Sequence, residues 1–403
     1  APSNLTFTYF ANNRAKNSYQ TVKKDSTDYQ TIANSKNEDC VPLITSPRLS
    51  EEVINKTYKI ELKFNSSVKA LDYYHYKDSE DDFKNSWKES QNSYGVVDGE
   101  AIMCVVPFAD VDKLSNYTAP SYGNPYPSID AFLEYYLEVV NRMDKMIGLE
   151  FDTDNPLDQN YRVKYTAVAD SGVNAGAYYN GDFIAVCSNS IAPIFQYGWG
   201  TLHEIAHGYQ GNLGRGANSL GSLCLNETGN NILAHYIQMD STLYKKTDRY
   251  IGELSKAENS NNATRKQKVS SGEGIFNNKN GTYTNTAEKL YCLVNLFDNF
   301  EGTTTYAKLF SYFRALVNEQ GVNAFSIQDV YAKFFAKEYN ANIIPYLKSW
   351  GVENSSEVER EIVSSGAKAY MITSDTLTSE SLEEVMAGEN LTLKYGLVSE
   401  DVL

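Results

Sequence analysis

The chain has 403 residues, of which 42% are hydrophobic and 22% are charged, so it is long enough for two or three packed units with a sizeable core. Its 51 acidic residues against 36 basic ones give a formal charge of −15, which disfavours nucleic acid because that binding needs Lys and Arg to displace counterions from phosphates. No apolar run approaches the roughly 20 residues that a membrane-spanning helix needs. We therefore expect a soluble protein with neither a nucleic-acid partner nor a membrane span. We also expect a monomer.

The five cysteines are widely spaced and contain no C-x-x-C pair. This pattern favours neither a disulfide framework nor a thiolate zinc site, so we interpret most of them as buried thiols. No basic and apolar leader opens the sequence, and we expect any secretion signal to have been removed.

The first hundred residues favour β structure. Tyr58–Phe64 alternates apolar and polar side chains with the period of a half-buried strand, and Asp98-Gly99 between two apolar runs predicts a tight hairpin. We interpret the acidic run Asp78–Asp82 as a solvated loop. Together these features predict an N-terminal β-rich module over residues 1–112.

A helix over 129–147 is predicted next, because Ser128 can cap it, apolar residues follow the i, i+3, i+4 spacing, and Gly148 can end it. Strands are predicted over 161–168 and 176–186, the second folded back at Asn180-Gly181. Apolar stripes over 286–350 predict a helical lobe whose aromatic residues form core. The last part, 351–403, contains strand-like residues 369–372 and an acidic tail, and has no predicted role.

Two of the four histidines lie in the sequence His203-Glu204-Ile205-Ala206-His207. On a helix over about 194–210, residues i and i+4 share one face, so both imidazoles can bind one tetrahedral zinc ion. Glu204 projects about 100° away, where its carboxylate can take a proton from a metal-bound water without binding the metal. With so few histidines, random placement yields this pattern only about 0.003 times in such a chain.

A third ligand is predicted downstream, at the start of a helix over about 226–240. Glu227 precedes an apolar-periodic segment and can complete a His2Glu set that leaves the fourth position to water. The alternative is an ordinary surface glutamate favoured by the positive end of the helix dipole. We expect one Zn²⁺ per chain. We interpret His235, two turns further on, as a core residue rather than a group that orients a metal ligand or a donor to the transition state.

These motifs resemble a known family. Gly176-Ala177-Tyr178-Tyr179, then H-E-I-A-H-G-Y at 203–209, then Glu227 with Asn230-Asn231, are similar to the M60 or enhancin-like zinc peptidases of the gluzincin clan. The resemblance covers roughly residues 60–350. It implies an α+β fold in which an N-terminal β-rich, sandwich-like module precedes a thermolysin-like zincin catalytic unit, residues 113–350, with a helical C-terminal subdomain.

The resemblance also implies an activity. It makes His203, His207 and Glu227 the zinc ligands and Glu204 the general base of a secreted endopeptidase that hydrolyses mucin-type, O-glycosylated proteins in extracellular settings. Three alternatives stay open: a general zinc protease without glycan dependence, an aminopeptidase, and a glycan-binding or mucin-binding adhesin without catalysis. An intact base argues against the adhesin, because a binding module has no need of Glu204.

Other residues are candidates around this site. Asn226 and Asn231 can fix the second ring N–H groups of the ligating imidazoles, or else serve as a helix cap and a solvated surface residue. The strand formed by Gly176, Ala177, Tyr178 and Tyr179 can offer main-chain groups to an extended substrate. The two tyrosines either stack on sugars or pack in the core. We interpret Trp199 as core and the Gly-rich stretch 211–221 as a flexible segment near the cleft entrance.

Overall fold

The structure is a computed structural model that describes residues 5–22, 29–32, 39–45, 61–64, 66, 68–115, 125–161, 164–181, 183–215, 223, 225, 227–243, 276, 286–321 and 326–370. The chain forms two compact units. The first comprises Ala1–Val140, Arg162–Ile205 and Lys245–Thr247, and the second Asn141–Tyr161, Ala206–Tyr244 and Asp248–Leu403.

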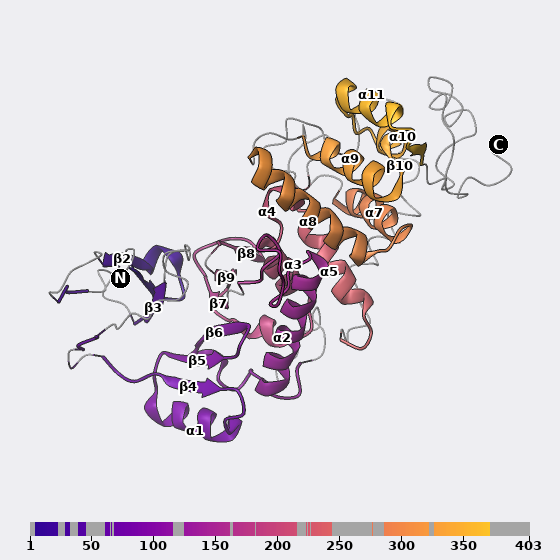
Figure 1. Ribbon diagram of the computed structural model, residues 1–403. Helices are drawn as coiled ribbons and strands as arrows, with labels where there is room; N and C mark the ends of the chain where they lie inside the picture. The colour runs from indigo at the N-terminus through magenta and orange to yellow at the C-terminus, as the bar shows by residue number, and fades with distance from the viewer. Residues whose placement is uncertain are drawn as a thin grey trace. The chain divides into compact units, whose positions relative to one another are not determined.

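A six-stranded mixed sheet forms the centre of the first unit (Figure 1). Its strands are β4 (Asp72–His75), β5 (Tyr94–Asp98), β6 (Ile102–Pro107), β7 (Tyr165–Ala169), β8 (Ala177–Tyr179) and β9 (Phe183–Val186), in the spatial order β4-β5-β6-β7-β9-β8. The β5–β6 and β8–β9 pairs are antiparallel, and the other three pairs are parallel. β8 therefore lies at one edge of the sheet.

The hairpin predicted at Asp98-Gly99 is confirmed. The Gly99 amide donates to the Ile102 carbonyl at 2.9 Å, which closes the turn between β5 and β6. A Cβ atom on Gly99 would lie 2.8 Å from the Cδ2 atom of Leu133 on helix α2 (Ile129–Met146), so the Leu133 side chain would have to shift to admit a side chain there.

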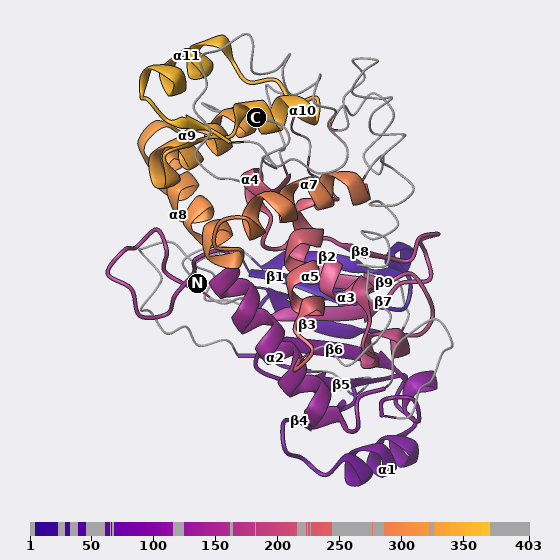
Figure 2. The same ribbon diagram turned by 90° about the vertical axis from the view of Figure 1, so that its right-hand side faces the viewer.

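Helices cover one face of this sheet. Helix α1 (Glu80–Ser90), α2 and the beginning of α3 (Trp199–His207) lie on this face (Figure 2). The Tyr74 ring contacts Phe83 of α1 with 5.5 Å between ring centroids, and its hydroxyl donates to Asp130 of α2. On β7, the Tyr165 hydroxyl donates to the Ile205 carbonyl of α3 at 3.2 Å.

The opposite face packs against a second sheet. This antiparallel sheet has the order β2-β1-β3 and consists of β1 (Leu5–Phe10), β2 (Ser18–Val22) and β3 (Val41–Thr45). Phe10 and Val41 form a buried cluster with Val96, Val105 and Val168 of the larger sheet. Burial of these apolar side chains holds the two sheets together.

The acidic run Asp78–Asp82 was predicted to be a loop, and this prediction is wrong, because the run begins helix α1. Ser79 is the N-cap, and its hydroxyl accepts from the Asp82 amide at 3.3 Å. Acidic side chains in the first turn face the positive end of the helix dipole, while Phe83 and Trp87 bury the other side of the helix. The prediction counted charge and overlooked this cap.

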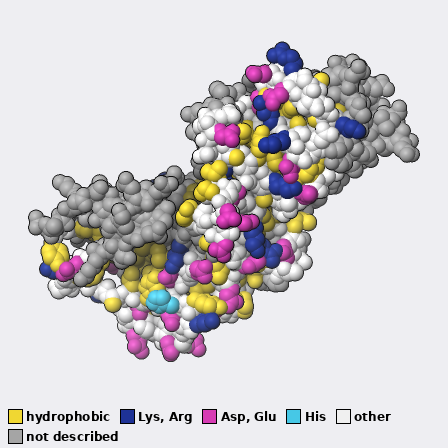
Figure 3. Space-filling model, viewed as in Figure 1, with side chains coloured by type: hydrophobic (Ala, Val, Ile, Leu, Met, Phe, Trp, Pro, Cys, Tyr) yellow, Lys and Arg dark blue, Asp and Glu magenta, His cyan; other side chains and the backbone are white. Residues whose placement is uncertain are grey.

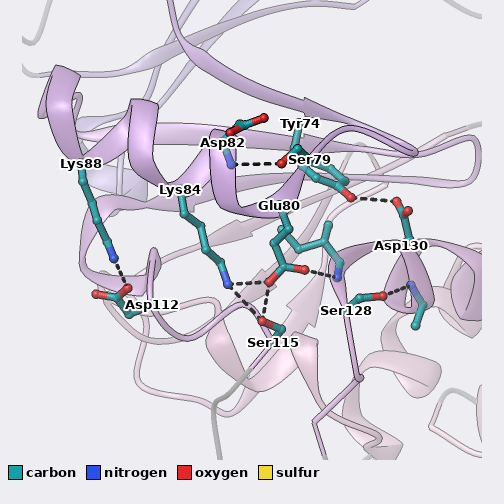
Figure 4. A network of polar contacts seen from close by, with 12 residues as sticks. Tyr74, Ser79, Glu80, Asp82, Lys84, Lys88, Asp112, Ser115, Ser128 and Asp130 are labelled. Atoms are coloured by element: carbon teal, nitrogen blue, oxygen red, sulfur yellow. Dashed lines mark hydrogen bonds and ion pairs between the residues drawn. The ribbon is translucent and has the colours of Figure 1, made fainter.

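Glu80 also joins α1 to α2 (Figure 4). One carboxylate oxygen accepts from Lys84 and from Ser115, each at 2.5 Å, and the other accepts from the Ile129 amide at 3.0 Å. The Ser128 hydroxyl accepts from the amide of Ala131 at 3.0 Å, as predicted for a helix cap. The first turn of α2 is thus stabilised by two acceptors.

The second unit is mainly helical, as predicted for residues 286–350. It contains α4 (Gly211–Arg215), α5 (Gly229–Met239), α7 (Thr286–Asp298), α8 (Thr303–Gln320), α9 (Ile327–Tyr339), α10 (Ile344–Ser349), α11 (Ser356–Ser364) and a parallel pair, β10 (Ala341–Asn342) with β11 (Lys368–Ala369). The described residues also include 3₁₀ helices at Arg14–Lys16, Phe108–Asp110 and Ala192–Phe195.

The end of α2 is fixed by an arginine. Gly148 has a φ of +68° and ends the helix as predicted. Arg314 of α8 donates to the carbonyls of Ile147 and Gly148 at 2.8 and 2.9 Å, and its guanidinium pairs with Asp158. The positive guanidinium satisfies carbonyls that the helix itself leaves unpaired.

The α+β class predicted from the sequence is confirmed. Residues 61–64 form no strand, and the rest of the strand predicted over Tyr58–Phe64 lies outside the described residues, as do the acidic tail and Cys224. The large sheet takes strands from both sides of the boundary predicted at 112, and the three-part domain division stays a prediction. Among the described residues no helix is long and apolar enough to span a membrane. Acidic and basic side chains are interspersed over the face shown in Figure 3.

Candidate metal centre

Helix α3 carries both histidines of the H-E-x-x-H motif. It is shorter than predicted and runs from Trp199 to His207. Leu202, Ile205 and Ala206 are fully buried and fix the helix against the protein interior. His203 and His207 therefore lie one turn apart on the same side, as the spacing requires.

The structure brings these two imidazoles together with Glu227. His203, His207 and Glu227 each offer a ligand atom, and these atoms all lie within 4.8 Å of one another. The Glu227 Oε2 atom is 3.4 Å from His207 Nε2. Two imidazoles and one carboxylate are the donors of catalytic zinc sites that keep a fourth position open, so these residues fit such a metal. No other group of three or more such side chains converges in the part of the chain that the structure describes.

Glu227 is positioned by a turn rather than by a helix. It lies two residues before α5 begins, in a turn where the Leu225 carbonyl accepts from the Thr228 and Gly229 amides at 2.7 and 2.9 Å. The Asn231 side chain, 1% exposed, donates to the Glu227 main-chain carbonyl at 2.6 Å. The helix predicted from 226 thus begins at Gly229, and Asn231 supports the main chain of the third predicted ligand.

His207 has two further polar neighbours, Gln210 and Asn230, which are not among the site residues predicted from the sequence. Its Nδ1 atom lies 2.7 Å from the side-chain oxygen of Gln210, and its Nε2 atom lies 3.0 Å from the side-chain nitrogen of Asn230. Gln210 is 1% exposed and Asn230 is fully buried. Helix α3 ends at His207, so the i, i+3 spacing of a helix does not by itself place Gln210 beside the imidazole.

Glu204 lies inside the protein next to the first ligand. It is 6% exposed and follows His203 on α3. Burial and the charge of Asp170, with a smaller contribution from Glu204, raise the pKa of the Cys187 thiol just after β9. The carboxylate of Glu204 is thus within electrostatic reach of the central sheet.

Trp199 was predicted to be core, but it is only partly buried. Its ring packs on the imidazole of His203, with 4.6 Å between the ring centroids and an interplanar angle of 53°. The indole therefore restricts the orientation of the first predicted ligand.

The hairpin predicted at Asn180-Gly181 is confirmed and forms the sheet edge. The Asn180 amide donates to the Phe183 carbonyl at 3.0 Å, and Gly181 has a φ of +76°. Tyr179 is partly buried, and its hydroxyl donates to the Gly181 carbonyl at 3.1 Å. A Cβ atom on Gly176 would meet nothing within 4 Å. Substrate binding by this strand stays a prediction.

Tyr178, the other tyrosine of that strand, packs toward the core. Its hydroxyl donates to Asp170 at 2.6 Å, its ring lies 4.4 Å from the Arg14 guanidinium carbon, and it contacts Phe183. These contacts match the core alternative rather than a ring free to stack on sugars.

Both carboxylate oxygens of Asp170 accept hydrogen bonds. Besides Tyr178, it accepts from the Arg14 amide, the Arg14 side chain and the Gly172 amide, each at 2.9 Å. Burial of the carboxyl group raises its pKa, but the hydrogen bonds outweigh burial, and the net effect is a pKa below the usual value.

His235 is a buried residue on α5. It is 7% exposed, and burial lowers its pKa to about 4, so it is neutral over the physiological range. This agrees with the interpretation as a core residue. Asn226, the remaining candidate, lies outside the described residues.

The sequence of the chain matches a known peptidase family over most of its length. The sequence profile of the family described as Peptidase M60, enhancin and enhancin-like, matches residues 67–351. Among curated proteins, no sequence match was found.

Solved structures with a similar fold include three bacterial proteins. A conserved protein of unknown function from Bacillus anthracis has a TM-score of 0.63 at 15% identity, with 98% of this chain and 73% of that one covered. The catalytic module of the metalloprotease ZmpA from Clostridium perfringens has a TM-score of 0.57 at 12% identity, covering 89% and 68%. The M60 catalytic domain of ZmpC from the same organism, solved with the sialyl T antigen, has a TM-score of 0.59 at 15% identity, covering 91% and 70%.

Proposed function

Because the chain belongs to the M60 peptidases, enhancin and enhancin-like, we propose that it is a zinc endopeptidase that hydrolyses peptide bonds in mucin-type, O-glycosylated proteins. The observation that carries this proposal is the convergence of His203, His207 and Glu227 within 4.8 Å, with Glu204 buried beside them. This arrangement combines three metal donors with one carboxylate that is not part of the ligand set.

Each of these side chains has a distinct task. His203, His207 and Glu227 would hold one Zn²⁺, which, when bound, supplies the Lewis acidity that makes water nucleophilic near pH 7. Glu204 accepts the proton of the attacking water and passes it to the nitrogen of the leaving amine. The low exposure of Glu204 strengthens its electrostatic interactions, because little bulk water screens them.

The substrate class rests on a similar fold and on the sheet edge. The M60 domain of ZmpC was solved with the sialyl T antigen, an O-glycan structure, which supports a glycoprotein substrate for this chain. The main-chain groups of β8, with Gly176 before it, would pair with an extended peptide. Tyr179 is the tyrosine of this strand that we assign to sugar contact, because Tyr178 is held by Asp170.

The finer features of the fold and the setting belong to the same proposal. We assign a thermolysin-like arrangement to the catalytic unit and a sandwich-like arrangement to the N-terminal module. The protein acts as a secreted monomer, with its substrate outside the cell.

The decisive experiment is digestion of one mucin-type glycopeptide with and without its O-glycans, with new termini read by mass spectrometry. We expect internal cleavage of the glycosylated form, strongly reduced cleavage by Glu204→Gln, and about one zinc per chain in both proteins. Stepwise loss of single N-terminal residues would instead indicate an aminopeptidase. Equal cleavage of both peptides would remove the glycan dependence, and binding without fragments would indicate an adhesin.

A further inference from the structure

The side chain of Gln210 makes two contacts at the end of the zinc-binding helix. Its oxygen lies 2.7 Å from His207 Nδ1, and its nitrogen donates to the Gly214 carbonyl at 3.4 Å. An amide oxygen only accepts hydrogen bonds, so His207 Nδ1 carries the proton, and the lone pair is on Nε2. The amide group of Asn230, 3.0 Å from Nε2, donates to that lone pair and requires the same tautomer.

This tautomer is the one that a metal ligand needs here. Nε2 is the His207 atom that lies 3.4 Å from the Glu227 carboxylate, on the side where the three ligand atoms converge. His207 would offer the lone pair of Nε2 to a metal at this place, while Gln210 keeps Nδ1 protonated and the ring fixed. The contact with Asn230 is the one that the metal would replace.

A second contact links the same segment to the third ligand. A Cβ atom on Gly229 would lie 1.8 Å from the Gly214 carbonyl oxygen and 2.6 Å from its carbon. Such distances exclude any side chain, so the main chain of α4 touches the main chain at the start of α5 directly. Gly229 follows Glu227 by two residues, and the Gly214 amide donates to the Gln210 carbonyl at 2.7 Å.

We propose that Gln210 and the contact between Gly214 and Gly229 form a positioning link that sets His207 and Glu227 relative to each other for metal binding. This inference rests on the proposed zinc site. Gln210, Gly214 and Gly229 themselves touch neither metal nor substrate, and act only through the ligands. Their effect therefore appears first in zinc affinity.

The first test compares Gln210→Leu with Gln210→Glu. The leucine has a similar volume but no acceptor, whereas the glutamate keeps an oxygen acceptor for Nδ1–H. We expect Gln210→Leu to raise the Kd for Zn²⁺, measured by competition with a chelator, by about 10- to 100-fold, and Gln210→Glu to stay within about threefold of the wild type. The Co²⁺-substituted proteins provide a second measurement, because the visible spectrum should change in the leucine variant alone.

The second test uses two glycines. Gly229→Ala should raise the Kd for Zn²⁺ by at least as much as Gln210→Leu, because the new Cβ atom separates α4 from α5. Gly200→Ala is the matched control, since Gly200 lies within α3 and a Cβ atom there meets nothing within 4 Å. Its zinc affinity should equal that of the wild type.

Two results would overturn the positioning link. One is wild-type zinc affinity in Gln210→Leu, and the other is an equal loss of affinity in the leucine and glutamate variants, which would indicate a merely structural role. If Gly229→Ala does not fold, the comparison of Gln210→Leu with Gln210→Glu still tests the positioning link. The proposed function fails separately, when the wild-type protein binds no zinc or cleaves no peptide.

Discussion

The clusters around Asp170 and around His207 are both polar, but their hydrogen bonds are completed in different ways. Asp170 is 2% exposed and accepts from Tyr178, from Gly172 and twice from Arg14. Each oxygen of the carboxylate receives two donors, so the group is satisfied within the protein. Such a cluster joins segments that are far apart in sequence, and its role is structural rather than catalytic.

The cluster around His207 is organised to leave acceptor atoms facing one another. Gln210 takes the ring N–H and Asn230 donates to Nε2, while Nε2 also lies 3.4 Å from the Glu227 carboxylate and converges with a ligand atom of His203. Convergent lone pairs repel each other unless a cation or a donor lies between them. The contrast teaches that one acceptor enclosed by donors from distant segments marks a structural cluster, whereas convergence of acceptor atoms from three side chains marks a site that fits a cation.

Removal of a predicted metal ligand from the His207 cluster should have the largest effect. His203→Ala and Glu227→Ala should each lower the zinc content from about one ion per chain to well below half and abolish hydrolysis, because two donors hold zinc weakly. Metal analysis after gel filtration measures the effect. Unchanged zinc in both variants would refute the ligand set.

Removing the base should separate metal binding from turnover. Glu204→Gln keeps the shape of the side chain but cannot take a proton, so we expect kcat to fall by about 10²–10⁴-fold while zinc content stays the same. Initial rates on a glycopeptide, with metal analysis of the same sample, provide the measurement. Residual activity close to that of the wild type would remove Glu204 from its role.

Disruption of the Asp170 cluster should lower the stability of the fold and leave zinc binding unchanged. Asp170→Asn turns one acceptor oxygen into a donor that faces existing donors, so the free energy of unfolding should fall by about 2–3 kcal/mol. Zinc content should stay at that of the wild type. Urea titration gives the loss of stability, and loss of zinc in a folded Asp170→Asn protein would show that the two clusters are not independent.

The pH dependence of the Asp170 contribution has a definite sign. Because the folded-state pKa of Asp170 is below its unfolded value, its contribution is present above the unfolded pKa and is lost as pH falls through the folded one. The stability difference between wild type and Asp170→Asn should therefore shrink in strong acid.

Substitution of His235 should have the smallest effect, on the pH dependence of the free energy of unfolding. It takes up a proton in the unfolded chain near pH 6.5 but in the folded protein only near pH 4, so the wild type loses stability as pH falls between these values. His235→Leu removes this loss, and relative to its value at pH 7.5 the variant should gain about 1 kcal/mol on the wild type at pH 5.5. Urea titrations at both pH values measure the difference, and a difference independent of pH would contradict the buried neutral state.

Local signals in the sequence predicted much of this structure. The Asp98-Gly99 and Asn180-Gly181 turns and the cap at Ser128 depend on neighbouring residues only, and all three are confirmed. The H-E-x-x-H spacing likewise brought His203 and His207 to one side of a helix, although their role as ligands stays a prediction.

The features that were missed depend on contacts between distant segments. Nothing near Tyr178 in the sequence shows that Arg14 and Asp170 hold it, so its packing was left open. The role of Gln210 depends on where α3 ends and on the approach of Gly214 to Gly229, which only the folded chain defines.

The parallel pairing of β6 with β7 has a consequence for folding kinetics. Ile102 pairs with Tyr165, so the whole of α2 and its flanking loops must be enclosed before these strands meet. Contacts of such sequence separation form slowly, because loop-closure entropy is lost before any pairing compensates for it. The β5–β6 hairpin, which closes over three residues, is expected to form early, and the central sheet to be completed only after α2 has docked.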